Sequence, residues 1–216
     1  MFEDRRHAGI KLTEKLKDFD RCDNYIIFAI PRGGVVVGAE VAQRLHLPLD
    51  LIITKKIRAP YNPELAIGSM DPTGKINVDQ TLVSRLDVSP AYLQKEAETT
   101  MAQIKKQLEQ YRKSADYPNL EHTTAIIVDD GIATGQTVMA AIGFLRNLHV
   151  QRIIVATPVV APSTLSELSK LVDEVRYVLC EEHFFAVGQF YRDFTQVNDE
   201  QVIDIMEDIR NNRNQK

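Results

Sequence analysis

Two kinds of hydrophobic pattern alternate along this chain. Short, continuous apolar runs predict buried strands, whereas longer segments with apolar residues at every third or fourth position predict helices. We expect strands at residues 25–30, 49–53, 124–128, 152–156 and 175–179. We expect helices at residues 35–45, 89–111, 136–148 and 163–171, and a last one capped by Asn198. This alternation predicts an α/β fold with a doubly wound, mainly parallel sheet.

Residues 55–79 break the alternation, because they hold three prolines, two glycines and a cluster of positive charge. Asp71-Pro72-Thr73-Gly74 is a strong turn signal between two short β-like runs, and it predicts a hairpin. We expect residues 55–63 to form a long, mobile loop. The chain is therefore expected to fold as a single domain over residues 1–216, with a core at about 25–179. A small hood would come from the N-terminal segment and residues 180–216.

Composition limits the function classes. A net charge of -4 among 216 residues argues against a protein that coats nucleic acid. The sequence lacks a run of about 18 uncharged apolar residues and an apolar leader, so we expect no membrane span and a cytoplasmic location. The two cysteines and five histidines show no metal-ligand spacing, so we expect no dedicated metal site.

The strongest functional signal follows the strand expected at residues 124–128. That strand ends in Asp129 and Asp130, and a loop and a helix come next. Ligands of open α/β sheets bind beyond the carboxyl ends of strands, which is where this loop lies. The small residues Gly131, Ala133 and Gly135 let backbone N–H groups approach an anion, and the helix N-terminus adds positive charge. The loop therefore suits a phosphate monoester, with the hydroxyl groups of its two threonines as further donors.

The two carboxylates narrow the ligand. The loop has neither the Gly-Lys-Ser/Thr of a Walker loop nor the G-x-G-x-x-G dinucleotide fingerprint. Two aspartates would repel a phosphate unless another group separates the carboxylates from it. A diol can fill that gap, because each hydroxyl donates a hydrogen bond to a carboxylate. A diol followed by a phosphate describes ribose 5-phosphate. The plainer interpretation, a strand-to-helix turn with an aspartate cap, explains only one aspartate and one glycine.

Residues 126–137 resemble the signature of the type I phosphoribosyltransferases: an apolar strand, two acidic residues, then a small-residue loop that ends in Thr-Gly-x-Thr. More closely, residues 2–210 are similar to a family of phosphoribosyltransferases with no assigned acceptor. The shared motifs are Asp4-Arg5, Ala8-Gly9, Pro31-Arg32-Gly33-Gly34, Ala59-Pro60, Pro63-Glu64, Val187-Gly188, Tyr191 and Asp193-Phe194. The resemblance implies Mg²⁺-dependent transfer of phosphoribosyl from phosphoribosyl pyrophosphate (PRPP) to a nitrogen nucleophile, a nucleobase, with release of pyrophosphate.

The resemblance also assigns roles to residues. It implies four catalytic residues: Asp129, Asp130, Arg32 and Lys56. It implies substrate contacts at Gly33, Gly34, Gly131, Ile132, Ala133, Thr134, Gly135, Gln136, Thr137, Phe185 and Asp193. The Arg32 turn is taken as the pyrophosphate loop, because two glycines permit close approach and arginine is a forked donor suited to diphosphate. Mg²⁺ is expected on PRPP oxygens, with no metal cage in the protein.

Several alternatives stay open. The basic segment with Lys56 is either a lid over the reacting centre or a solvated loop, and Glu64 in it is a speculative acid/base candidate. Phe185, Phe190 and Tyr191 either stack on the base or pack the hood. Ala133 replaces the acidic loop residue of some purine-salvage members, which disfavours a hypoxanthine/guanine activity. A PRPP- or nucleotide-sensing protein without catalysis is the main alternative function, a sugar-phosphate hydrolase ranks last, and a homodimer is left open.

Overall fold

The centre of the molecule is a five-stranded, fully parallel sheet with the strand order β2-β1-β6-β7-β8. The computed structural model describes residues 1–213, except the side chains of residues 63, 64, 212 and 213. The strands span Leu49–Leu51 (β2), Tyr25–Ala29 (β1), Thr124–Val128 (β6), Arg152–Val160 (β7) and Glu174–Cys180 (β8). The parallel α/β core predicted from the hydrophobic pattern is thus confirmed, with β7 four residues longer than expected.

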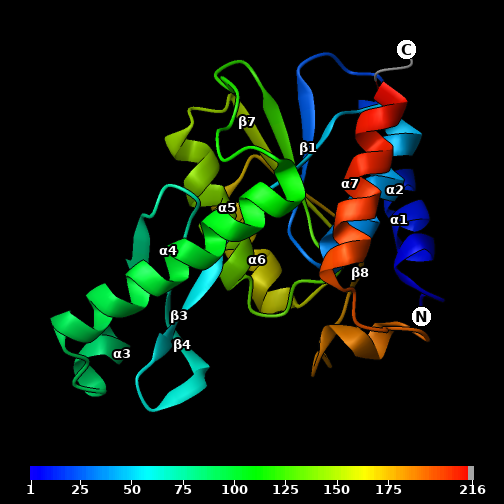
Figure 1. Ribbon diagram of the computed structural model, residues 1–216. Helices are drawn as coiled ribbons and strands as arrows, with labels where there is room; N and C mark the ends of the chain where they lie inside the picture. Colours follow the sequence, from blue (N-terminus) through cyan, green and yellow to red (C-terminus); the bar gives the residue numbers. More distant parts are fainter. Residues whose placement is uncertain (214–216) are drawn as a thin grey trace.

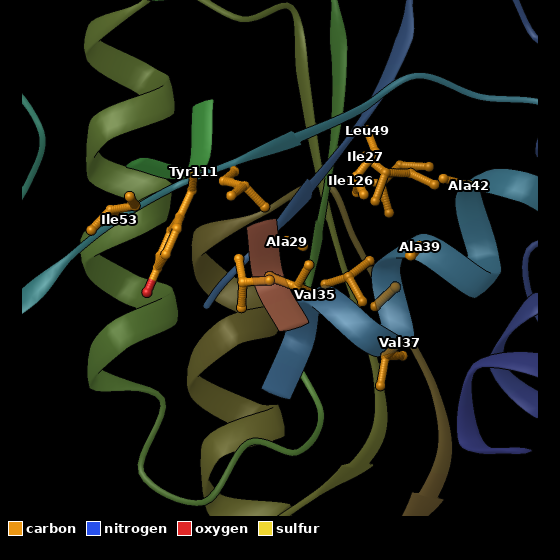
Figure 2. Packing of buried hydrophobic residues seen from close by; sticks show 14 of the residues in the cluster. Ile27, Ala29, Val35, Val37, Ala39, Ala42, Leu49, Ile53, Tyr111 and Ile126 are labelled. Carbon is orange, nitrogen blue, oxygen red and sulfur yellow. The ribbon is translucent and has the colours of Figure 1, made fainter. Parts of the chain in front are cut away.

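Helices cover both faces of this sheet, which explains why its inner strands are continuously apolar. Along β6, Ile126 and Val128 face one core cluster, whereas Ala125 and Ile127 face the other. The first cluster is closed by helices that gather on one side in Figure 1, and α2 residues such as Val35 pack on β1 in Figure 2. These helices are α1 (Arg5–Glu14), α2 (Gly33–Leu45) and α7 (Asp199–Arg213). The second cluster is closed by α5 (Gln136–Asn147) and α6 (Pro162–Leu171).

Residues 55–78 form a separate antiparallel sheet, β3-β4-β5, with strands Lys55–Ala59, Asn62–Met70 and Ile76–Val78. The hairpin at 71–74 is confirmed: an Asp71 carboxylate oxygen accepts from the backbone N–H groups of Thr73 (2.8 Å) and Lys75 (3.1 Å). The long loop expected at 55–63 is wrong. Ile57 and Ala59 are buried, alternate with charged residues and so form β3, which pairs with β4.

A long helix packs against β3 and β4 of this smaller sheet. The helix α4 (Pro90–Arg112) is preceded by its N-cap Ser89, whose hydroxyl accepts from the Tyr92 N–H as expected. The short α3 (Gln80–Arg85) was not expected, and neither was α1. Charged residues and Gly9 interrupt the pattern of α1, although Ala8 and Leu12 are fully buried.

The hood is smaller than expected. The backbone N–H of Phe2 donates to Phe190 (2.7 Å), and that of Arg192 donates to Phe2 (2.8 Å), so the N-terminus does join the segment after β8 there. The segment also holds the short 3-10 helix η2 (Val187–Phe190). The expectation for the last part of the chain is wrong, because α7 packs its apolar face into the main core beside α2 (Figure 1). Among the described residues, no helix combines the length and apolar character needed to cross a membrane.

Candidate active site

Asp129 and Asp130 follow the central strand β6, at the carboxyl edge of the sheet. The Asp129 carboxylate accepts from the backbone N–H of Asp130 (2.9 Å). The Asp130 carboxylate accepts from Nε of Arg5 (2.7 Å), and both of these side chains are nearly buried, at 13% and 10% exposure. Within the described part of the chain, Arg5 is thus the one cation that forms an ion pair with either carboxylate, and its partner is Asp130.

Arg5 is a site residue that the sequence pattern alone did not identify. Its Nη1 donates to the Thr195 carbonyl (2.8 Å), and its guanidinium carbon lies 3.8 Å from the centre of the Phe194 ring. These contacts hold Arg5 between the acidic pair and the hood. The available signal was its place in the Asp4-Arg5 pair of the resembled family, with Asp4 as the N-cap of α1.

Desolvation shapes the electrostatics of the acidic pair. Burial, followed by the neighbouring charge of Asp130, raises the pKa of Asp129 well above its ordinary value. Burial also raises the pKa of Asp130, although the Arg5 side chain opposes this change. Both carboxylates would gain from a partner that donates hydrogen bonds or carries positive charge.

The turn at residues 31–34 lies directly against this pair. A Cβ atom on Gly33 would be 1.9 Å from Oδ2 of Asp130, and one on Gly34 would be 2.9 Å from Cα of Asp129. Only glycine fits at these contacts, so the two glycines allow the turn and the strand end to touch. The Pro31-Arg32 peptide bond is cis. The Arg32 guanidinium lies at the start of α2, where its Nη1 is 3.3 Å from Oδ1 of Asp199.

The loop after the acidic pair is held by hydrogen bonds to β7 and α6. The Ile132 N–H donates to the Val159 carbonyl (2.9 Å), and the Thr164 hydroxyl donates to the Ala133 carbonyl. Gly135 has φ +71° and leads into α5, which has no side-chain cap. Among the described residues, the N–H groups of Ala133, Thr134 and Gly135 have no protein acceptor. The loop therefore presents backbone donors beside an uncapped helix N-terminus, an arrangement that suits an anion.

The basic strand β3 lies next to this loop. A small hollow of about 40 Å³ is lined by Lys55 and Lys56 on one side and by Gln136 and Thr137 on the other. The Thr54 hydroxyl also reaches the Thr137 carbonyl (3.5 Å). A larger hollow of about 330 Å³ continues along α4, and its lining includes both lysines and Arg58. Burial, and then the charge of Arg58, lowers the pKa of Lys55.

The three aromatic residues considered for base stacking differ in their burial within the hood. Phe190 and Tyr191 are buried, so the packing interpretation is correct for these two. The Tyr191 hydroxyl donates to the Asp130 carbonyl, which ties the hood to the acidic pair. Phe185 is 90% exposed, and its ring is the one of the three that remains available for stacking. The Asp193 carboxylate accepts from the N–H (2.9 Å) and hydroxyl (2.5 Å) of Thr195.

Comparison with known proteins decides the family. The family model "Phosphoribosyl transferase domain" matches residues 5–195 of this chain. The chain belongs to the phosphoribosyl transferase family. It is 32% identical over 203 residues to "Putative phosphoribosyl transferase MT0597" of Mycobacterium tuberculosis, a match that covers 94% of this chain and 46% of that protein. The chain thus spans less than half the length of the curated relatives it matches.

A solved structure shares the fold of this chain. The crystal structure of TT1426 from Thermus thermophilus superposes with a TM-score of 0.79 at 34% identity, covering 96% of this chain and 98% of that one. The five-stranded parallel sheet with flanking helices is the type I phosphoribosyltransferase fold. The resemblance inferred from the sequence motifs is therefore confirmed.

The fold brings most of the predicted site residues together. The strand end with Asp129 and Asp130, the Gly33 turn and the 131–137 loop are joined by the contacts described above. Lys56 is exposed on β3, beside Thr137, as the hollow between them shows. Asp193 lies farther along the hood, where it lines a surface hollow with Arg5 and Thr195. The acid/base candidate at position 64 has a side chain outside the described part of the structure.

Proposed function

We propose that this phosphoribosyl transferase family member is an Mg²⁺-dependent enzyme that moves the phosphoribosyl group of PRPP onto the nitrogen of a nucleobase and releases pyrophosphate. The supporting observation is the contact between the two segments that we assign to the anionic groups of PRPP. The Gly33 turn touches the Asp130 carboxylate, and the loop of Thr134 follows that carboxylate directly. A ligand with two anionic ends and a diol between them suits this arrangement.

Each part of PRPP has a matching set of groups. The 5-phosphate would accept from the backbone N–H groups of Ala133, Thr134 and Gly135 and from the threonine hydroxyl groups. The ribose diol would donate hydrogen bonds to Asp129 and Asp130. Burial raises the pKa of both carboxyl groups in spite of their partners in the protein, so such donors would stabilise their ionised forms. The diphosphate would lie at the Arg32 turn, with Lys56 on the facing strand.

In the proposed reaction, the bond between C1 of the ribose and the diphosphate oxygen breaks while a bond from the base nitrogen to C1 forms. The bonding electrons leave with the pyrophosphate, and the base nitrogen then loses a proton to water. Such a step depends on positioning and charge compensation. The Arg32 guanidinium would compensate the charge that grows on the leaving group. The Asp130–Arg5 pair, braced by Tyr191, would keep the diol-binding carboxylate in one place.

The oxygen donors fit Mg²⁺. This ion prefers oxygen ligands and is usually held by one or two carboxylates together with substrate phosphates and water. PRPP would supply most of the oxygens that hold the ion, with Asp129 or Asp130 as the protein carboxylate beside it. When bound, the ion would neutralise charge on the diphosphate. Among the described residues there is no group of three or more His, Cys, Asp and Glu side chains that could hold a metal ion.

The test is turnover. The protein is incubated with PRPP, MgCl₂ and a panel of nucleobases and amines, and pyrophosphate is measured. We expect pyrophosphate with at least one base, and no turnover in EDTA. Asp130→Asn should abolish turnover, whereas Glu200→Gln, a matched loss of one carboxylate on α7, should not. PRPP binding by calorimetry without turnover of any acceptor would instead identify a sensor.

A further inference from the structure

The carboxylate of Asp199 stands beside the arginine of the proposed diphosphate site. Its Oδ1 lies 3.3 Å from Nη1 of Arg32, with side-chain exposures of 50% and 38%. Asp199 is the first residue of α7 and lies beyond residues 5–195, the segment matched by the family model. The contact joins segments that are 167 positions apart in the sequence.

The structure fixes this carboxylate firmly. The Tyr111 hydroxyl donates to the same Oδ1 atom at 2.7 Å, and Tyr111, in the last turn of α4, is fully buried in the core (Figure 2). The amide of Gln107 donates to the Tyr111 hydroxyl in turn (3.3 Å). The backbone is set by Asn198, whose side chain accepts from the Gln201 N–H (2.8 Å) as an N-cap. These hydrogen bonds therefore hold the Asp199 carboxylate near Arg32.

The charge of Asp199 also reaches a lysine of the smaller sheet. Burial lowers the pKa of Lys55, as do the charges of Arg58 and Arg32, whereas the charge of Asp199 raises it. Asp199 thus acts on Lys55 as well as on Arg32. A diphosphate bound at Arg32 would meet a fixed carboxylate on the same guanidinium, and two anions that share one cation repel each other.

We propose that Asp199 is a built-in counter-ion of the diphosphate site, which weakens the binding of pyrophosphate and of PRPP through Arg32. This inference rests on the proposed function. Its consequence for turnover is easier release of the pyrophosphate product. The same carboxylate has no such effect on ligands without a diphosphate, because the 5-phosphate loop lies at the end of another strand.

The experiment uses inorganic pyrophosphate with MgCl₂ in isothermal titration calorimetry, at constant ionic strength. Asp199→Asn removes the charge and keeps an oxygen that accepts from Tyr111. We expect this variant to bind pyrophosphate about three- to tenfold more tightly and to bind ribose 5-phosphate as wild type does. Glu200→Gln removes the same charge one residue away and should change neither affinity. In an Arg32→Ala background, Asp199→Asn should give no gain.

Other outcomes overturn the inference. Weaker pyrophosphate binding by Asp199→Asn would mean that Asp199 positions Arg32, and an equal gain in Glu200→Gln would mean a general field effect. A gain in Tyr111→Phe as large as that in Asp199→Asn would assign the effect to the hydrogen bond. Unchanged binding by Asp199→Asn, in a protein whose Arg32→Ala variant loses affinity, overturns this inference alone. A wild type that binds no pyrophosphate overturns the proposed function as well.

Discussion

The contact between Gly33 and the acidic pair gives a sharp test of the site. Gly33→Ala would place a methyl carbon 1.9 Å from Oδ2 of Asp130 and 2.8 Å from Nε of Arg5. Such atoms essentially never approach within 3.0 Å, so the carboxylate or the turn must move by roughly 1 Å. The Asp130–Arg5 bond is only 2.7 Å long, and a movement of this size breaks it.

The expected cost follows from these contacts. Overpacking costs about 1–3 kcal/mol, and separating two nearly buried charges adds to it. We expect the free energy of unfolding in urea to fall by at least about 1–3 kcal/mol. Ribose 5-phosphate binding should weaken by about tenfold or more, because the Asp130 carboxylate leaves its place.

A second glycine provides the matched control. Gly143 lies inside α5, and the nearest atom to a Cβ there is Nδ2 of Asn77 at 3.9 Å. Gly143→Ala should therefore stabilise the protein by about 0.5–1 kcal/mol through helix propensity and leave binding unchanged. If Gly33→Ala unfolded at the wild-type urea concentration and bound ribose 5-phosphate equally well, the proposed contact between turn and carboxylate would be refuted.

Three further predictions address the other parts of the site. Arg32→Ala should weaken the binding of PRPP by about 1.5–3 kcal/mol and leave the binding of ribose 5-phosphate unchanged, whereas Thr134→Val should weaken the binding of both. If calorimetry showed equal losses of both ligands for Arg32→Ala, the two anion sites would be misassigned. Because the pKa of Asp129 is raised, the native state binds more protons than the unfolded chain between the ordinary and the raised pKa, and stability falls as the pH rises through that window. Asp129→Asn should accordingly raise the melting temperature at pH 7, by about 2–4 °C for each kcal/mol gained, and lose this gain in acid below the ordinary carboxyl pKa; a lower melting temperature at pH 7 would contradict it. Phe185→Leu should raise the Michaelis constant of the base at unchanged PRPP affinity, because base stacking on an aromatic ring is worth about 1–3 kcal/mol, and full retention of every base activity would assign Phe185 to the hood surface.

Much of the fold, and the placement of the acidic pair and of the Gly33 turn at strand ends, could be predicted because the signals are local. The strand at 124–128 and the loop after it form one continuous segment, and their ligand-binding geometry depends mainly on that segment. The turn at Gly33 is also contiguous with its strand and helix. The error at residues 55–63 arose because the prolines at 60 and 63 outweighed a two-residue alternation of only five positions.

The remaining site residues could not be found this way, because their roles depend on distant partners. Arg5 meets Asp130 across 125 positions, and Tyr111 meets Asp199 across 88. Neither residue stands in a pattern that indicates chemistry: Arg5 is one charge in a charged terminus, and Tyr111 is one apolar position on a helix face. Only the packing of α1 against α2, and of α7 against α2 and α4, brings such residues to the site.

The contacts that hold Asp130 connect the proposed ribose site with the hood, where we expect the acceptor. Asp130 is held through its carboxylate by Arg5 and through its carbonyl by Tyr191. Both braces contact the hood: Arg5, at the start of α1, lies on the Phe194 ring, and the Tyr191 ring packs on Phe2 at 5.3 Å. On the proposed function, a change in the hood that alters the acceptor therefore also reaches the carboxylate assigned to ribose. Phe185 is different, because its exposed ring is not part of either brace, and we expect acceptor preference to vary there while the proposed PRPP site stays intact.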